Sequence, residues 1–179
     1  RPNRVWFSLA VEDVPVVDGE LHIDLSKDLL KITAIERKHV PDKHFTAFIR
    51  GFNLKRGAVA TSAAWDLADI ITVGASEADM ALAVNRIRQM KGGTVVCADG
   101  EILAEMALPI GGVMSYEPMD ILAKQLLSIQ KAVSDLGFPY PDLRTTLAVI
   151  ATSAIPFLRI CEDGLYNVKE DKLVDLIID

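Results

Sequence analysis

The first part of the chain alternates apolar and polar side chains in short runs. An alternation with a period of two is typical of strands that bury one face. It predicts strands at residues 5–11, 21–25, 30–35, 45–52, 57–62 and 70–74. Pro15, Gly19 and Pro41 separate the first of these runs, and turn-forming residues of this kind favour reversals of the chain. A largely antiparallel sheet is the expected product.

The hydrophobic period changes to that of a helix after Ser76. The Ser76 hydroxyl can cap the start of a helix, and acidic side chains follow it in the first turn, where they stabilise the exposed N–H groups. Gly92 and Gly93 end the helix. Its apolar stripe consists of Met80, Val84 and Ile87.

A hairpin is predicted directly after this helix. Asp99 and Gly100 form a dipeptide that readily takes the positive φ values of a two-residue turn. The runs that flank it, residues 94–98 and 101–107, have the composition of strands. This turn is the most specific local signal in the chain.

A long second helix is predicted after Ser115, which can cap it with Pro118 in the first turn. Gly137 and Pro139 stop this helix. It covers fewer than three heptads, which favours packing on the sheet over a coiled-coil dimer. Its apolar stripe steps by three and four through Met119, Leu122, Leu126, Ile129, Val133 and Leu136.

In the last part of the chain, the residue pattern predicts a third helix at residues 143–150, a loop around Pro156 and a peripheral charged tail after Glu162. No internal repeat and no linker rich in serine, glycine or proline interrupts the chain. The pattern therefore predicts an α+β fold, in which a mixed, largely antiparallel sheet packs with three to four helices. Residues 1–179 are expected to form a single domain.

Composition narrows the classes of partner. Of the 179 residues, 50% are apolar and 25% charged, which excludes a disordered tail or a fibrous repeat. With 19 basic and 25 acidic residues the formal net charge is −6, so no nucleic-acid partner is expected. The longest uncharged stretch, residues 145–158, is shorter than the roughly 20 apolar residues of a membrane helix, so no membrane partner is expected. Cys97 and Cys161 lie in apolar neighbourhoods, which predicts buried thiols in a reducing cytoplasm.

Residues that could carry hydrolytic chemistry are sparse. The three histidines, His22, His39 and His44, lack the spacing of a zinc hydrolase, and each is expected at the surface or at a strand edge. The alternative is a metal held by His39 and His44 across Pro41, with Asp42 as the one nearby carboxylate, which is a weak donor set. No serine or cysteine lies in a nucleophile motif, and no glycine pair has the setting of a phosphate loop. The residues alone predict a domain without a self-contained active site.

Three segments nevertheless follow one another in the order and spacing of a known family. They read Gly-Phe-Asn-Leu-Lys-Arg-Gly-Ala-Val-Ala-Thr-Ser at 51–62, Asp-Met-Ala-Leu-Ala-Val-Asn-Arg at 79–86 and Leu-Pro-Ile-Gly-Gly-Val-Met-Ser at 108–115. Shorter pieces agree at 35–37, 92–93, 99–100, 155–156 and 163–165. In combination they resemble the C-terminal domain of the bacterial and archaeal adenine deaminases of the amidohydrolase superfamily. The resemblance is best over residues 30–168.

This resemblance implies a longer enzyme of purine metabolism, in which a metal-dependent (β/α) barrel precedes this segment and hydrolyses adenine to hypoxanthine and ammonia. The barrel would hold manganese or iron with its own ligands, so no cofactor is expected in this chain. The implied partners are that N-terminal barrel, a small-molecule purine and a second copy in a homo-oligomer. The chain opens with Arg1-Pro2 where an intact gene product would open with Met, which agrees with a piece of a longer protein.

The sequence departs from the family pattern where that pattern has histidines. Residues 65–69 read Trp-Asp-Leu-Ala-Asp in place of the family's His-Asp-Ser-His-Asn, so Trp65 and Ala68 replace both imidazoles. Residues 36–38 read Glu-Arg-Lys in place of Glu-Arg-His. If the family histidines help to close the active site of the barrel, these changes leave a different heterocycle or a related amide open as an alternative substrate to adenine.

Four residues are candidates for facing the substrate or the preceding domain. Asp66 is the retained member of the family motif, and its carboxylate could accept a hydrogen bond from an exocyclic amine; the alternative is an aspartate that caps a turn. Trp65 offers a stacking face, or fills core or interdomain space. Lys55 and Arg56 precede Gly57 in a predicted turn, where they either face solvent or form salt bridges with the barrel.

Two functions of different classes therefore remain open. The first is the C-terminal portion of an adenine deaminase-like hydrolase, in which this chain by itself is expected to be inactive. The second is a noncatalytic interaction or oligomerisation domain. Under the first hypothesis a detached interdomain face should leave apolar side chains exposed on this chain.

Overall fold

The computed structural model describes residues 10–37, 40, 43–64, 69–152 and 157–177. The helices are α1 (Glu77–Met90), α2 (Met119–Asp135) and α3 (Leu143–Ala151), with a short 3-10 helix η1 at Leu25–Lys27. The strands are β1 (Val16–Val17), β2 (Glu20–Leu21), β3 (Leu30–Ile35), β4 (His44–Ile49), β5 (Ala58–Thr61), β6 (Ile70–Gly74), β7 (Gly93–Ala98), β8 (Glu101–Ala107), β9 (Leu158–Cys161), β10 (Gly164–Asn167) and β11 (Lys172–Val174).

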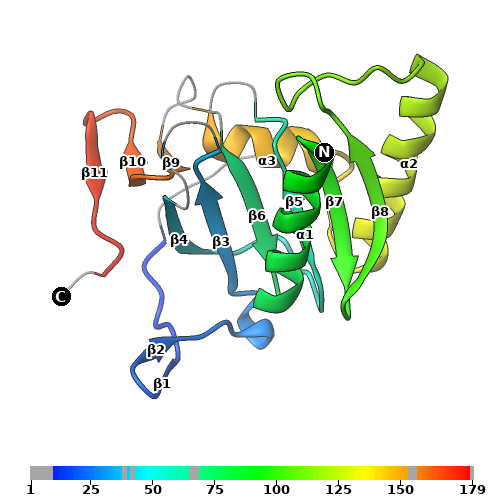
Figure 1. Ribbon diagram of the computed structural model, residues 1–179. Helices are drawn as coiled ribbons and strands as arrows, with labels where there is room; N and C mark the ends of the chain where they lie inside the picture. Colours follow the sequence, from blue (N-terminus) through cyan, green and yellow to red (C-terminus); the bar gives the residue numbers. More distant parts are fainter. Residues whose placement is uncertain (1–9, 38–39, 41–42, 65–68, 153–156, 178–179) are drawn as a thin grey trace.

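Six strands build the main sheet in the order β4-β3-β6-β5-β7-β8, and each neighbouring pair among them is antiparallel. Helix α1 covers one face of this sheet, and α2 and α3 lie on the other (Figure 1). β9, β10 and β11 form a small antiparallel sheet at one side, and β1 pairs with β2 in a separate hairpin. The predicted α+β fold with a largely antiparallel sheet is confirmed.

Alternation along β3 shows how the sequence sorts residues between the two faces. Leu30, Ile32 and Ala34 are buried in the cluster that also contains residues of α2 and α3. Lys31 and Thr33 point to the opposite face, because successive side chains of a strand project to opposite sides. The polar positions of β3 therefore lie on the side of α1.

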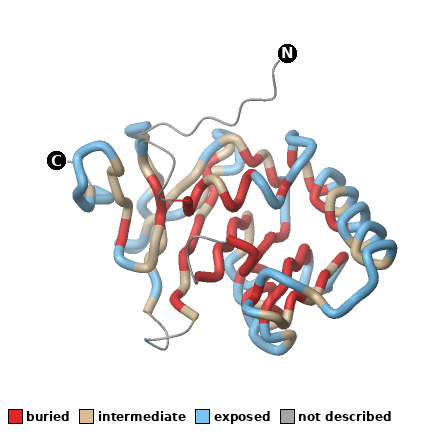
Figure 2. Tube along the Cα trace, turned by 90° about the horizontal axis from the view of Figure 1, so that it is seen from above, coloured by how far each residue is buried: buried red, intermediate tan, exposed pale blue. Residues whose placement is uncertain are grey.

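The apolar core is divided between the two faces of the sheet, with buried residues concentrated in its centre (Figure 2). On the side of α1, the small side chains of Ala58 and Ala60 let the helix approach β5, where Ile87 is fully buried. Gly74 on β6 has the same effect, since a Cβ there would collide with Met80. Close packing over β5, β6 and β7 fixes the position of α1 on the sheet.

The strongest local predictions are confirmed. Ser76 caps α1 by accepting a hydrogen bond from the Asp79 amide at 3.2 Å. Asp99 and Gly100 have φ values of 56° and 80° in the turn between β7 and β8. Among the described residues, no helix combines the length and the apolarity that crossing a membrane requires.

Other predictions need correction. The start of α2 is not capped by Ser115: Pro118 is the N-cap residue and makes no side-chain cap. Met119 belonged to the predicted buried stripe but is 81% exposed, because the first half of α2 extends past the core. Residues 21–25 do not form one strand, since Leu21 ends β2 and Leu25 begins η1. The segment after Glu162, which was predicted as a peripheral charged tail, forms β10 and β11. The strand predicted at 5–11 lies largely outside the described residues.

Candidate functional site

Several of the segments that carry the sequence signals meet at one end of the main sheet. Glu36 and Arg37 follow the last residue of β3, and Asp69 directly precedes β6. Because Ile35 pairs with Ile70 across these two strands, Glu36 and Asp69 come to neighbouring positions at the sheet end. We call the residues gathered there the polar junction: Glu36, Arg37, Asp69, Gly111, Gly112 and Glu162.

Arg37 ties the junction to the loop that follows β8. Its Nη2 donates a hydrogen bond to the Gly111 carbonyl at 2.7 Å. Gly112 has a φ of +82°, and a Cβ at this position would overlap the Arg37 guanidinium. The Ser62 hydroxyl donates to the Gly112 carbonyl at 2.7 Å and accepts from the Gly93 amide at 2.8 Å. The glycines noted in the sequence thus allow this loop to pack closely on the sheet end.

The junction contains buried carboxyl groups. Asp69 is 2% exposed and Glu36 is 6% exposed. Burial raises the pKa of Asp69 to about 7, with a hydrogen bond to the Glu162 side chain and the charges of Glu162 and Glu36 as further causes. The second carboxyl oxygen of Asp69, Oδ2, has no hydrogen-bond partner among the described residues. A carboxyl group with a pKa near neutrality can both accept and donate a proton under physiological conditions.

A backbone contact holds Glu36 in place, and Arg37 is the cation next to both acids. Glu36 Oε2 accepts a hydrogen bond from the Val40 amide at 2.6 Å. Burial lowers the pKa of the Arg37 guanidinium overall, and the charges of Asp69 and Glu36 act in the opposite direction. The junction therefore combines two buried acids, Glu36 and Asp69, with the partly exposed Arg37 and Glu162.

Of the four predicted site residues, Lys55 and Arg56 do not lie at this end of the sheet. Trp65 and Asp66 lie outside the described residues. Arg56 forms a salt bridge with Asp99 in the turn between β7 and β8, and Lys55 donates its backbone N–H to the Leu136 carbonyl at 2.9 Å. Both precede β5, whose other end is at the junction, so the length of β5 separates them from it.

Sequence reasoning did not select two of the residues that the junction brings together. Asp69 was noted only as part of the altered family motif, although a carboxylate directly before a fully buried strand is a visible signal. Glu162 was placed at the start of a tail. Its contact with Asp69 joins positions far apart in the chain, and no local pattern predicts such a pair.

The described side chains do not fit a hydrolytic metal centre. The one group of three potential ligands among them is Cys161, Glu162 and Asp163, in the turn between β9 and β10. Asp163 Oδ1 already pairs with Lys43 Nζ at 2.5 Å, and burial raises the pKa of the Cys161 thiol, which disfavours the thiolate that binds metals. His44 is exposed on β4, and His39 lies outside the described residues. Catalytic zinc sites combine histidine with other ligands and keep one open position, and this group contains no histidine.

The family profile described as "Adenine deaminase C-terminal domain" matches residues 8–172. Among similar proteins, an adenine deaminase of Brucella abortus is 40% identical over 173 residues, which are 97% of this chain and 30% of that protein. An adenine deaminase of Cereibacter sphaeroides is 38% identical over 167 residues, 93% of this chain and 30% of the relative. An adenine deaminase of Sinorhizobium fredii is 39% identical over 161 residues, which are 90% of this chain and 28% of that protein. The chain thus spans less than a third of the length of these relatives.

Proposed function

This chain belongs to the adenine deaminase C-terminal domain family, and from that membership we propose that it is the C-terminal domain of a longer adenine deaminase-like hydrolase. The observation that carries the proposal is the coverage: the Brucella abortus relative matches 97% of this chain but only 30% of its own length. The remaining part of such an enzyme is long enough for a separate catalytic domain. The proposed reaction converts adenine and water to hypoxanthine and ammonia.

In this proposal the preceding domain is a barrel that holds manganese or iron, and the metal supplies an activated water. The potential metal ligands among the described residues support a metal site in the barrel and not in this chain, because the cluster of Cys161, Glu162 and Asp163 does not fit a hydrolytic centre. The chain contributes scaffold, interdomain contacts and one wall near the site. It stays a prediction that residues 1–179 form one domain. The cytoplasmic location also stays a prediction, and the free thiols of Cys97 and Cys161 support it.

We propose the polar junction as the part of the chain that faces the preceding domain. Its buried Asp69 Oδ2 has no donor among the described residues, and burial of an unpaired polar atom is costly. Because that atom is inaccessible from outside, the groups of the junction that could contact the preceding domain are the partly exposed Arg37 and Glu162. Trp65 and Asp66 stay proposed contributors because they are close to Asp69 in sequence, and Lys55 and Arg56 stay proposed interdomain contacts at the other end of β5.

Ammonia release from adenine tests the division of labour. Three samples are compared, each with added manganese or iron: this chain alone, the full product of its gene, and that product without this chain. We expect turnover by the full product and none by this chain alone. Turnover at an enzyme-like rate by the isolated chain would overturn the proposal, and so would a full product whose preceding part lacks a histidine-bearing barrel. Aminopurines and related amides tested in parallel decide whether the substrate is adenine or an altered heterocycle.

A second candidate function, an oligomerisation domain, is favoured by exposed apolar side chains in and before α2. Met114, Tyr116, Met119 and Leu127 are 57%, 82%, 81% and 71% exposed. Exposed apolar groups of this kind are typical of protein interfaces. Sedimentation of this chain and of a Leu127→Lys variant distinguishes self-association from docking of the preceding domain on this surface. If the chain is an oligomer and the substitution dissociates it, self-association is supported. If both proteins are monomers, the surface is left to the preceding domain.

A further inference from the structure

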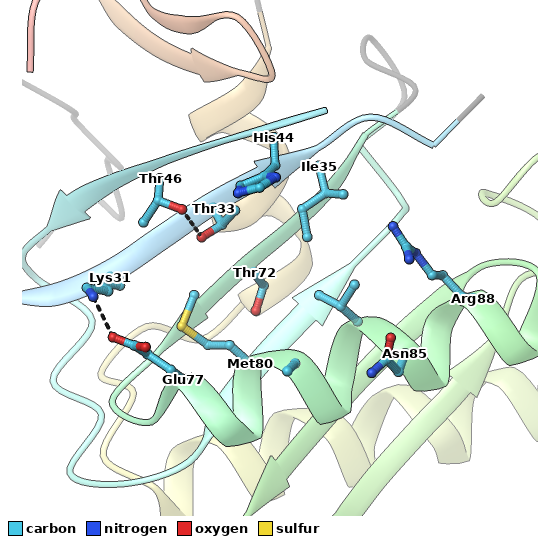
Figure 3. A pocket seen from close by; sticks show the side chains of 12 residues that line it. Lys31, Thr33, Ile35, His44, Thr46, Thr72, Glu77, Met80, Asn85 and Arg88 are labelled. Carbon is cyan, nitrogen blue, oxygen red and sulfur yellow. Dashed lines mark hydrogen bonds and ion pairs between the residues drawn. The ribbon is translucent and has the colours of Figure 1, made fainter. Parts of the chain in front are cut away.

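A groove of about 410 Å³ lies beside α1, on the face of the main sheet that this helix covers only in part (Figure 3). Helix α1 packs on β5, β6 and β7, and the next strands, β3 and β4, extend beyond it. No residue of the polar junction lines this groove. Because sites for small molecules span about 300–1,000 Å³, the groove is large enough for one small organic ligand.

The charged side chains that line the groove are already engaged within the protein. Lys31 forms an ion pair with Glu77 at one end of the groove (Figure 3). Arg88 and His44 each have an interaction partner as well. A charged ligand would therefore lose its hydration in this groove without meeting an unpaired countercharge, which is costly. The lining favours an uncharged ligand.

The floor of the groove carries a row of threonine hydroxyls. Thr33 on β3 and Thr46 on β4 are paired in the register of the sheet, and their Oγ1 atoms are 2.9 Å apart. One hydrogen bond between two hydroxyls uses one of their two protons, so the other proton and several lone pairs remain for a ligand. Thr72 on β6 donates its hydroxyl proton to the Val59 carbonyl at 3.0 Å, so towards a ligand it can only accept. The floor therefore offers uncharged groups that both donate and accept hydrogen bonds.

Helix α1 supplies an apolar wall and one side-chain amide. Met80 and Val84, each 7% exposed, form the wall, and Ile35 of β3 adds to it. The thioether of a methionine makes favourable contacts with aromatic rings. Asn85 also lines the groove (Figure 3), and within the described part of the chain its exposed amide has no hydrogen-bond partner. A side-chain amide donates and accepts at once, which matches the adjacent donor and acceptor on one edge of adenine.

We propose that this groove binds an uncharged nucleobase, with the flat ring against Met80 and Val84. The polar edges of the base reach the Asn85 amide and the hydroxyls of Thr33 and Thr46. The class of ligand, a planar uncharged heterocycle, follows from the lining of the groove, whereas the choice of a purine rests on the proposed function. The groove gives this domain a base-binding site made of its own residues.

Isothermal titration of this chain with adenine, AMP and benzimidazole tests the class of ligand. Adenine is expected to bind with a dissociation constant of about 1 mM or lower, as a small ligand of this size allows. AMP should bind no more tightly than adenine, because its phosphate meets no unpaired cation. Benzimidazole keeps the flat apolar ring but lacks the amino group, and it should bind about fivefold more weakly. No binding at about 5 mM adenine, binding of AMP about tenfold tighter than that of adenine, or equal binding of benzimidazole would each overturn the proposal.

Matched variants locate the base in the groove. Asn85→Ala is expected to weaken adenine binding about fivefold and to leave benzimidazole binding unchanged. Gln89→Ala is the control, because Gln89 is an exposed amide of the same helix that does not line the groove. A double variant, Thr33→Val with Thr46→Val, removes both hydroxyls together, so neither is left without its partner, and it should also weaken adenine binding about fivefold. Unchanged adenine binding in either groove variant, or an equal loss in Asn85→Ala and Gln89→Ala, would refute the site.

Amide NMR shifts give a second readout of the position. Shifts induced by adenine should map to β3, β4 and α1, and shifts confined to other parts of the chain would contradict the proposal. These binding measurements do not depend on deamination, so a failure here is distinguishable from a failure of the proposed function.

Discussion

Replacing Asp69 by asparagine should stabilise the chain at pH 8. Asp69 is buried, it contacts Glu162, and Glu36 and Arg37 are the other charged groups of the junction that face it. The raised pKa means that the unfolded chain ionises this carboxyl at a lower pH than the folded chain does. The stability it contributes is therefore complete below about pH 4 and is lost as the pH rises toward 7.

The size of the effect follows from the two pKa values. A rise from the ordinary value of 3.8 to about 7 corresponds to about 4 kcal/mol of folding free energy. That figure is an upper limit, because the turn that carries Glu162 can shift and admit water. We expect Asp69→Asn to be about 2 kcal/mol more stable than the parent at pH 8 and to differ little from it at pH 4.

Urea unfolding followed by far-ultraviolet circular dichroism at pH 4, 6 and 8 measures these free energies. Asp79→Asn is the matched control, since Asp79 is also buried but its two oxygens accept hydrogen bonds from the Asp99 and Gly100 amides. An asparagine can accept only one of these, so that variant should lose about 1–2 kcal/mol at pH 8. If Asp69→Asn is no more stable than the parent at pH 8, the carboxyl is not held near neutrality by burial and the reasoning fails.

Three further predictions concern packing and thiol chemistry. Gly112→Ala should lower the melting temperature more than Gly100→Ala, because both positions have positive φ but only at Gly112 would a Cβ meet Arg37; equal losses would show that the guanidinium yields. Ile87→Ala should cost about 2–5 kcal/mol in urea unfolding, since this side chain of α1 is fully buried against the sheet, and a cost below about 1 kcal/mol would contradict that packing. The Cys97 thiol, whose pKa burial raises to about 11, should not react with Ellman's reagent at pH 8 until the chain is unfolded, and rapid reaction in the native state would refute its burial.

Local signals were sufficient for much of the fold. The strands at β3 and β6, the cap of α1 at Ser76 and the turn at Asp99 and Gly100 were all predicted from neighbouring residues. Each depends on interactions within a few positions of the chain, such as a hydroxyl that caps an amide or a backbone that tolerates positive φ. The start of α2 was predicted wrongly because Ser115 satisfies a local pattern that the chain does not use.

The candidate site shows the limit of such signals. Arg56 and Lys55 were selected for their charge, yet they are at the opposite end of β5 from the junction. Asp69 and Glu162 were not selected, and they meet only because a small sheet of three strands packs beside the main sheet.

The sequence by itself determined the fold class, the order of the strong elements and the family to which the chain belongs, because all three depend on patterns along the chain. Only the tertiary structure decided which charged groups share one environment. The pKa of Asp69 near neutrality arises from side chains on different elements, and the distances between them depend on strand register and on the packing of the small sheet. Those are set by the packing of the whole domain, in which no single segment contains the information.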